Sequence, residues 1–166
     1  MLLHNPRIIH LLIVFSVIGL MSYALYTQYV GGLVPCPLCI TQRLFYCLIG
    51  GFALIAAIDS NRYKIYSMLI ALSAFGGILT AGQQTRLQHL PPELVPACGP
   101  SLEYMLETFP FTETLKSLIL GDGNCAEIDW IFMGLSMAEW SLICFIGFFC
   151  VSIWQILHNP IRQADD

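Results

Sequence analysis

The stretch VPCPLCITQRLFYCLIGGFALIAAI, Val34 to Ile58, joins a pair of cysteines to a long apolar run. Cys36 and Cys39 have the Cys-x-x-Cys spacing of redox-active dithiols. The residues from 38 to 58 are mostly apolar and suffice for a transmembrane helix, which needs about 20 such residues. The stretch therefore predicts thiol redox chemistry at the surface of a bilayer.

The composition points to the same environment. Of the 166 residues, 57% are hydrophobic and only 11% are charged, whereas soluble domains have about 25% charged residues. We therefore expect an integral membrane protein. The net charge is −4, and without a basic patch we expect no nucleic-acid partner.

Four apolar segments can span a bilayer, at about residues 8–26, 38–58, 65–83 and 140–157. The first begins near the N-terminus but lacks a small-x-small cleavage site and ends among tyrosines suited to a membrane interface. We interpret it as a retained span rather than a signal peptide. The sequence predicts an all-α membrane protein, a single domain over residues 1–166 built as a four-transmembrane-helix bundle.

Four spans place both chain ends on one side of the membrane. Lys and Arg near span ends mark the cytoplasmic side, and the side with the chain ends carries Arg7, Arg62, Lys64 and Arg162. We therefore expect cytoplasmic termini and two outer loops, at about residues 27–35 and 84–138.

The longer outer loop is predicted to carry a short amphipathic helix. From Glu113 to Leu120, the apolar residues Leu115, Leu118 and Ile119 recur at helical spacing. Such a helix can lie on the membrane surface or pack over the bundle, and the sequence leaves both positions open.

The seven cysteines fall into two groups. Three lie inside predicted spans and are expected to act as small apolar side chains: Cys47, Cys144 and Cys150. Four lie on the outer side: Cys36, Cys39, Cys98 and Cys125. The outer group allows two static disulfides, a zinc site or a chain of exchanging thiols. The wide separation of Cys98 and Cys125 disfavours zinc, because structural zinc ligands usually come in closely spaced pairs.

The residues around the first pair favour exchange. Cys39 is expected in the first turn of the second span, where the free amides and partial positive charge of a helix N-terminus stabilise a thiolate. Pro37 suits a helix start. Arg43 follows Cys39 by one turn on the same face. It can snorkel to headgroups, but an ionisable residue within a span is a candidate for function.

Two blocks of sequence resemble a known family. CPLCITQR after a first span and GDGNCAEIDWIFMGLSMAEW, Gly121 to Trp140, resemble the bacterial inner-membrane disulfide-bond-forming protein B (DsbB) family. The order of elements matches over nearly the whole chain. The resemblance implies an inner-membrane thiol:disulfide oxidoreductase with its active cysteines on the periplasmic side. It would reoxidise a DsbA-like periplasmic thioredoxin-fold protein, pass the electrons to ubiquinone or menaquinone, and use no metal.

The resemblance also implies roles for the four outer cysteines. Cys36 and Cys39 would form the membrane-proximal redox pair. Cys98 and Cys125 would form the loop pair, with Cys98 attacked by the partner protein. The bridge between the pairs would be a transient Cys36–Cys125 disulfide.

The same resemblance implies a quinone beside Cys39, bound by Arg43, with Gln42 and Gln83 as further neighbours. The family often has Glu at the position of Gln42. Some members have a histidine at the outer end of the third span, where this chain reads Gln83-Gln84.

Two alternatives stay open. A quinone-linked oxidoreductase of the vitamin K epoxide reductase type also combines four spans with a Cys-x-x-Cys pair, but there the pair comes late in the bundle. A non-enzymatic four-span protein with stapled loops would hold its disulfides unchanged in mild dithiol.

Overall fold

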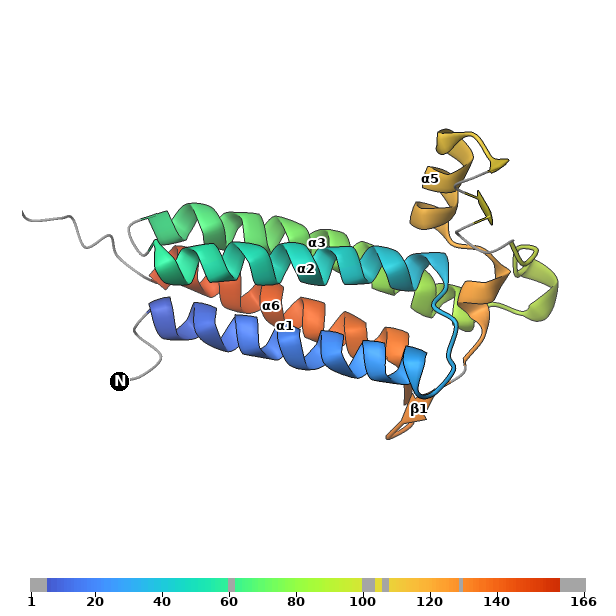
Figure 1. Cartoon of the computed structure of the whole chain (residues 1–166), viewed down its shortest axis with the longest axis horizontal. Helices are drawn as coiled ribbons and strands as arrows, with labels where there is room; N and C mark the ends of the chain where they lie inside the picture. Colours follow the sequence, from blue (N-terminus) through green and yellow to red (C-terminus); the bar gives the residue numbers. More distant parts are fainter. Residues whose placement is uncertain (1–5, 60–61, 100–103, 106–107, 129, 159–166) are drawn as a thin grey trace, which may run out of the picture.

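Four long helices form the body of the protein in a computed structural model that describes residues 6–59, 62–99, 104–105, 108–128 and 130–158. They are α1 (Pro6–Tyr29), α2 (Pro37–Ile58), α3 (Tyr63–Gln88) and α6 (Met137–His158), and they run side by side as a bundle (Figure 1). Each is long and apolar enough to cross a membrane. The predicted four-helix membrane bundle is confirmed, while Arg162 lies outside the described residues.

The bundle core is made of apolar side chains from all four helices. Tyr46 of α2 stacks on Phe145 of α6 with ring centroids 4.2 Å apart. The buried cluster includes Ile13, Val17, Ile49, Ala53, Ile70, Ala74 and Phe145. Large apolar side chains such as Phe15 and Leu72 remain exposed on the outside of the bundle, where lipid tails would cover them.

All four helices extend beyond the predicted spans, and the ends of α3 and α6 that reach the loops have clear local causes. α3 continues past residue 83 to Gln88, because no proline interrupts the chain between Tyr63 and Pro91. α6 begins at Met137 behind a capping box. There the Ser136 Oγ accepts from the Glu139 N–H at 3.3 Å, and the Glu139 Oε2 accepts from the Ser136 N–H at 2.7 Å.

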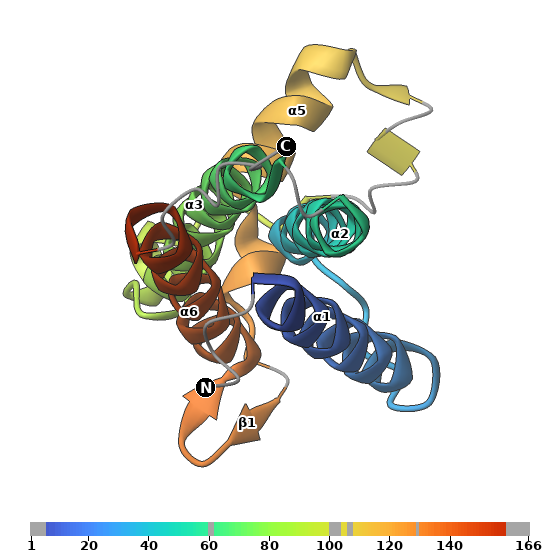
Figure 2. The same ribbon diagram turned by 90° about the vertical axis from the view of Figure 1, so that its left-hand side faces the viewer.

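The loop segments gather at one end of the bundle, which we call the cysteine end because Cys36, Cys39, Cys98 and Cys125 all lie there. They comprise η3 (Pro92–Leu94), α5 (Phe111–Leu120), η4 (Gly123–Ala126), β1 (Ile131–Phe132) and β2 (Leu135–Ser136). Figure 2 shows α5 on the side of α2 and α3, and the hairpin on the side of α1 and α6.

The predicted short helix is present as α5. The Thr41 hydroxyl of α2 donates to the Leu118 carbonyl at 2.9 Å, and the Gln83 amide of α3 donates to the Leu120 carbonyl at 3.2 Å. Leu115 and Ile119 remain exposed. The helix is therefore fastened to the bundle through its C-terminal turn and keeps an uncovered apolar side.

The β-hairpin is a feature that the sequence did not predict. β1 pairs antiparallel with β2, and both intervening residues have positive φ, 52° at Met133 and 83° at Gly134. Two successive positive φ angles are typical of the tight turns that match the twist of a hairpin.

Candidate active site

The first turn of α2 holds the Cys36–Cys39 pair. Cys36 is the N-cap with extended backbone, and its Sγ accepts a hydrogen bond from the Cys39 N–H at 3.4 Å. Pro37 occupies the first turn, where its fixed φ suits helix initiation. The Cys36 thiol lies 3.0 Å from the Cys39 Sγ. The two sulfurs are therefore adjacent at a helix N-terminus, as the sequence predicts.

Cys125 meets Cys36 in a buried cluster with Leu38 and Leu87. Cys125 is fully buried and Cys36 is only 8% exposed. The hydrogen bond with Cys125, followed by that with Cys39, raises the pKa of the Cys36 thiol. The same bond with Cys36 is the main cause that lowers the pKa of Cys125. Because a thiolate is the attacking species in exchange, the arrangement suits attack by Cys125 on the Cys36 sulfur.

A glycine directs the chain toward this contact. Gly121 follows α5 with φ +78°, and a Cβ on it would lie 2.6 Å from Leu38 Cδ1 and 2.9 Å from Leu87 Cδ1. Only glycine combines this positive φ with so close an approach to α2 and α3. The segment after Gly121 can therefore pack closely against α2 and α3, which places Cys125 against Cys36.

Cys98 is exposed but lies beside the turn that contains Cys125. A Cβ on Gly123 would come within 3.0 Å of the Cys98 Sγ and 2.5 Å of the Pro96 carbonyl oxygen. The Gly123 N–H donates to the Ala97 carbonyl at 3.2 Å. The structure therefore brings the segments of Cys98 and Cys125 together and leaves Cys98 exposed.

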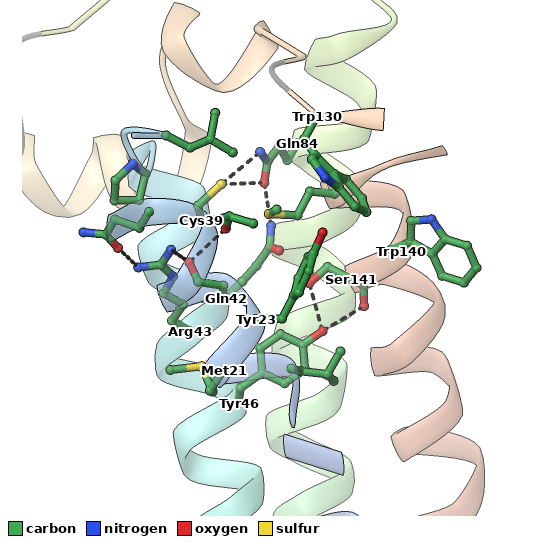
Figure 3. Close-up of a pocket in the computed structure, with 18 of the residues that line it drawn as sticks. Met21, Tyr23, Cys39, Gln42, Arg43, Tyr46, Gln84, Trp130, Trp140 and Ser141 are labelled. Carbon is green, nitrogen blue, oxygen red and sulfur yellow. Dashed lines mark hydrogen bonds between the residues drawn. The ribbon is translucent and has the colours of Figure 1, made fainter. Parts of the chain in front are cut away.

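A cavity of about 270 Å³ opens below the Cys36–Cys39 pair, between α1, α2, α3 and α6. Figure 3 shows Cys39, Gln84, Gln42 and Arg43 around its upper part. Its lining is mostly apolar, with polar groups from Thr27, Gln28, Gln42, Arg43, Tyr46, Gln84, Gln88, Glu127 and Ser141. Cys39, Gln42 and Arg43 thus line one cavity.

Gln84 is the polar side chain in contact with Cys39. Its Nε2 lies 3.2 Å from the Cys39 Sγ and 3.5 Å from the Cys36 Sγ. Its Oε1 accepts from the Gln42 Nε2 at 2.7 Å, which orients the amide with its donor group toward the sulfurs. Gln84 was not among the residues predicted for this site, because it stands at the outer end of the third span, where some members of the family have a histidine instead.

Gln83, which was predicted beside the acceptor, does not line the cavity. Its amide donates to the Leu120 carbonyl of α5 instead. The reason is the geometry of α3, since successive residues of an α-helix point about 100° apart. The residue that faces Cys39 is therefore Gln84, and the prediction for Gln83 is corrected.

Arg43 bridges α2 to α1 at the side of the cavity. Its guanidinium donates to the Gln28 side-chain oxygen and, at 3.2 Å, to the Ala24 carbonyl. These contacts hold the cation inside the bundle, next to the cavity that Cys39 also lines. The structure thus favours a fixed position for Arg43 over snorkelling.

Aromatic residues form the remaining walls. The Tyr46 hydroxyl lies 2.9 Å from the Ser141 Oγ. Tyr23 of α1 meets Trp130 of the hairpin segment edge to face at 5.7 Å. Trp130 and Trp140 both line the cavity, Trp130 from the segment before β1 and Trp140 from α6.

The membrane cysteines differ in location. Cys47 and Cys150 are exposed on the outside of the bundle, while Cys144 is half-buried and lines the cavity. All three therefore lie within the membrane-spanning helices, away from the cysteine end.

Comparison with known proteins identifies the family. The family model "Disulfide bond formation protein DsbB" matches residues 6–155. A disulfide bond formation protein B of Hahella chejuensis is 44% identical over 157 residues, 93% of this chain and 95% of the relative. One of Methylococcus capsulatus is 46% identical over 140 residues, 82% and 85% of the two chains. Disulfide bond formation protein B 1 of Pseudomonas aeruginosa is 41% identical over 160 residues, 95% and 98% of the two chains. With its buried cysteine contact and four membrane-spanning helices, the chain belongs to the DsbB family of disulfide bond formation proteins.

Proposed function

We propose that this protein reoxidises a DsbA-like thioredoxin-fold protein in the periplasm and passes the electrons through two cysteine pairs to a membrane quinone. The observation that carries the proposal is the buried contact of Cys125 with Cys36, directly beside Cys39 and its cavity. Cysteines from two distant loops meet there, as disulfide exchange between the loop pair and the membrane pair requires.

The cavity residues suit a quinone headgroup. A volume of about 270 Å³ with mainly apolar walls fits a flat ring, and small-molecule sites are typically apolar with a few oriented polar groups. The guanidinium of Arg43 and the amides of Gln42 and Gln84 offer donors for quinone carbonyl oxygens. When bound, a quinone supplies an acceptor for two electrons and two protons.

The first exchange would occur at Cys98. A thiolate of the partner attacks the Cys98 sulfur of a Cys98–Cys125 disulfide, a new bond forms to Cys98, and the electron pair leaves with Cys125. The exposure of Cys98 supports this entry point, because an attacking thiolate must approach the sulfur in line with the breaking bond.

The second exchange would carry the electrons inward. The Cys125 thiolate attacks the Cys36 sulfur of the Cys36–Cys39 disulfide, the Cys36–Cys125 bond forms, and the electron pair leaves with Cys39. Cys39 lies at the α2 N-terminus and 3.2 Å from the Gln84 amide donor, both of which stabilise negative charge on sulfur. Arg43 adds a cation beside the same cavity.

The proposed membrane is the bacterial inner membrane, with the cysteine end in the periplasm. Disulfides persist in that oxidising compartment. Arg7 and Lys64 lie at the opposite end of the bundle, where α1 and α3 begin (Figure 1), and positive residues near span ends favour the cytoplasm.

The test is anaerobic mixing of the purified full-length protein in lipid nanodiscs with a reduced thioredoxin-fold partner and ubiquinone. We expect one quinol for each partner disulfide, and loss of quinol formation when Cys36 or Cys39 is replaced by serine. Cys98→Ser should abolish partner oxidation. Cys47→Ser is the matched control, since Cys47 is exposed on the outside of the bundle.

Two results would contradict the proposal. Partner oxidation at the wild-type rate in Cys98→Ser would eliminate the entry point. Partner oxidation without quinol formation would eliminate the quinone as the acceptor.

A further inference from the structure

The turn between α5 and η4 holds a buried carboxylate beside a reacting cysteine. Asp122 is 7% exposed. Its Oδ1 accepts from the Asn124 N–H at 3.1 Å and lies 3.7 Å from the Cys125 Sγ. Among the residues that the structure describes, no Lys, Arg or His pairs with Asp122 within salt-bridge distance. Its charge therefore acts on the Cys125 sulfur without a neutralising partner in the described chain.

The turn that contains Asp122 also forms hydrogen bonds with Ala97 and Gly99, the residues on either side of Cys98. The Asn124 amide donates to the Gly99 carbonyl at 3.0 Å and lies 3.4 Å from the Asp122 Oδ2. The Gly123 N–H donates to the Ala97 carbonyl at 3.2 Å. Asp122 thus orients Asn124, and Asn124 in turn fastens the Cys98 segment to the Cys125 turn.

We propose that Asp122 is a further catalytic residue of disulfide exchange, whose negative charge drives the electron pair from Cys125 toward Cys36 and Cys39. The inference rests on the proposed function, because it concerns the direction of the second exchange. Asn124 is a positioning residue that acts through the Cys98 segment.

The charge of Asp122 affects the two exchanges in opposite directions. In the first exchange the Cys98–Cys125 bond breaks and the electron pair stays on Cys125, so a thiolate forms next to a carboxylate and is disfavoured by repulsion. In the second exchange Cys125 uses that pair to bond to Cys36, and the charge leaves with Cys39. The repulsion is then relieved, because the negative charge has moved toward Arg43 and the α2 N-terminus.

Several causes set the pKa of Cys125, which is lowered overall. The hydrogen bond with Cys36 lowers it most, burial raises it, backbone hydrogen bonds at Asp122 and Leu38 lower it, and the negative charge of the Asp122 carboxylate raises it. Replacing the carboxylate removes only the last of these causes. A thiolate of higher pKa is a stronger nucleophile and a poorer leaving group. The carboxylate therefore makes Cys125 slower to leave Cys98. At a pH at which Cys125 is deprotonated, it also makes the Cys125 thiolate faster to attack Cys36.

The experiment separates the two exchanges in the full-length oxidised protein. The protein in nanodiscs is mixed anaerobically with dithiothreitol, quenched with acid at successive times, alkylated and digested. Mass spectrometry then follows the loss of the Cys98–Cys125 disulfide and the appearance of the Cys36–Cys125 disulfide. Dithiothreitol replaces the partner protein, so the result does not depend on which partner is used.

The expected signature of Asp122→Asn is an opposite change in the two rates. At a pH above the pKa of Cys125, loss of the Cys98–Cys125 disulfide should be faster and formation of Cys36–Cys125 slower. Each rate should change by about threefold for every tenfold change in the acidity constant of Cys125, given a Brønsted coefficient of about 0.4–0.5 for thiol exchange. Asp122→Ser should do the same, and serine can also cap the turn, so it serves if the asparagine variant does not fold. Asp122→Glu keeps the charge and should keep the ratio of the two rates near that of the wild type.

Two controls separate charge from position. Asn124→Ala keeps the carboxylate but loses the bond to Gly99, so it should slow re-formation of the Cys98–Cys125 disulfide without reversing the ratio. Glu93→Gln removes an exposed carboxylate of the same loop and should change neither rate.

The inference is overturned if Asp122→Asn and Asp122→Ser keep the wild-type ratio of the two rates. A wild-type protein that never forms the Cys36–Cys125 disulfide would instead overturn the proposed function. The two failures are therefore distinguishable in one experiment.

Discussion

Gln84 and Cys39 are in direct contact, with the Nε2 of Gln84 3.2 Å from the Sγ of Cys39. The Gln84 Oε1 accepts from Gln42 at 2.7 Å and also lies 3.6 Å from the Cys39 Sγ. The side chain can therefore donate to a Cys39 thiolate or accept from a Cys39 thiol. A neutral amide thus serves both protonation states of the sulfur at the edge of the cavity.

The first prediction concerns this contact. Gln84→Leu should lower the single-turnover rate of quinol formation at least about tenfold, because a hydrogen bond to a charged group contributes about 1.5–3 kcal/mol. Stopped-flow absorbance of the quinone measures the rate. Gln83→Leu is the matched control, since its amide binds Leu120 outside the cavity. Equal losses in the two variants would rule out a specific role for Gln84.

A second prediction concerns the approach of the two loop segments at Gly123. A methyl group there would lie 2.5 Å from the Pro96 carbonyl oxygen and 3.0 Å from the Cys98 Sγ, so Gly123→Ala should push the Cys98 segment away. We expect slower re-formation of the Cys98–Cys125 disulfide after reduction, measured by alkylation and mass spectrometry, with the helix bundle intact by circular dichroism. Gly82→Ala is the control because its Cβ would meet nothing within 4 Å. An unchanged rate in Gly123→Ala would show that the close approach is not needed.

The contact between Cys36 and Cys125 predicts a pH effect in the reduced protein. The hydrogen bond from Cys36 is the main cause that lowers the pKa of Cys125. Cys36→Ala removes that bond, so Cys125 should need a higher pH to form its thiolate. The ultraviolet thiolate absorbance, taken as the difference between proteins with and without Cys125, measures the titration. A midpoint that stays the same or falls in Cys36→Ala would contradict the assigned cause.

The start of α6 gives a prediction of stability. The Ser136 hydroxyl donates to the Gln88 Oε1 at 2.8 Å and accepts from the Glu139 N–H at 3.3 Å. Ser136→Ala should lower the free energy of unfolding in micelles by about 1 kcal/mol, the typical cost of losing an N-cap residue. Ser16→Ala should change it by less than about 0.5 kcal/mol, because the Ser16 hydroxyl is exposed and bonds only its own helix. A loss of the same size in Ser16→Ala would show that the cap has no special role.

Much of the architecture follows from local patterns in the sequence. Apolar runs of about 20 residues can satisfy their backbone groups in lipid only as helices, so the four spans were predictable. The start of α2 was predictable as well, because Cys36 and Pro37 suit the positions before and within the first helical turn. The four outer cysteines stood out by their spacing and location, and Arg43 stood out because an ionisable residue within a membrane span is unusual.

The contacts of the site could not be derived in the same way. Gln83 and Gln84 are neighbours of the same residue type, and the rotation of α3 against α2 selects Gln84 for Cys39. The hairpin that carries Trp130 to Tyr23 depends on a two-residue turn within a long loop. The position of Asp122 beside Cys125 depends on how that loop packs on the bundle.

The sequence by itself therefore determined the membrane-spanning helices, the cysteine pairs and the family resemblance, because these depend on residue type and on spacing along one element. Only the tertiary structure decided that Cys125 lies against Cys36 and that Gln84 faces Cys39. Contacts between segments far apart in the chain depend on how the helices are rotated against one another and on how the loops pack. No local sequence pattern specifies either of these.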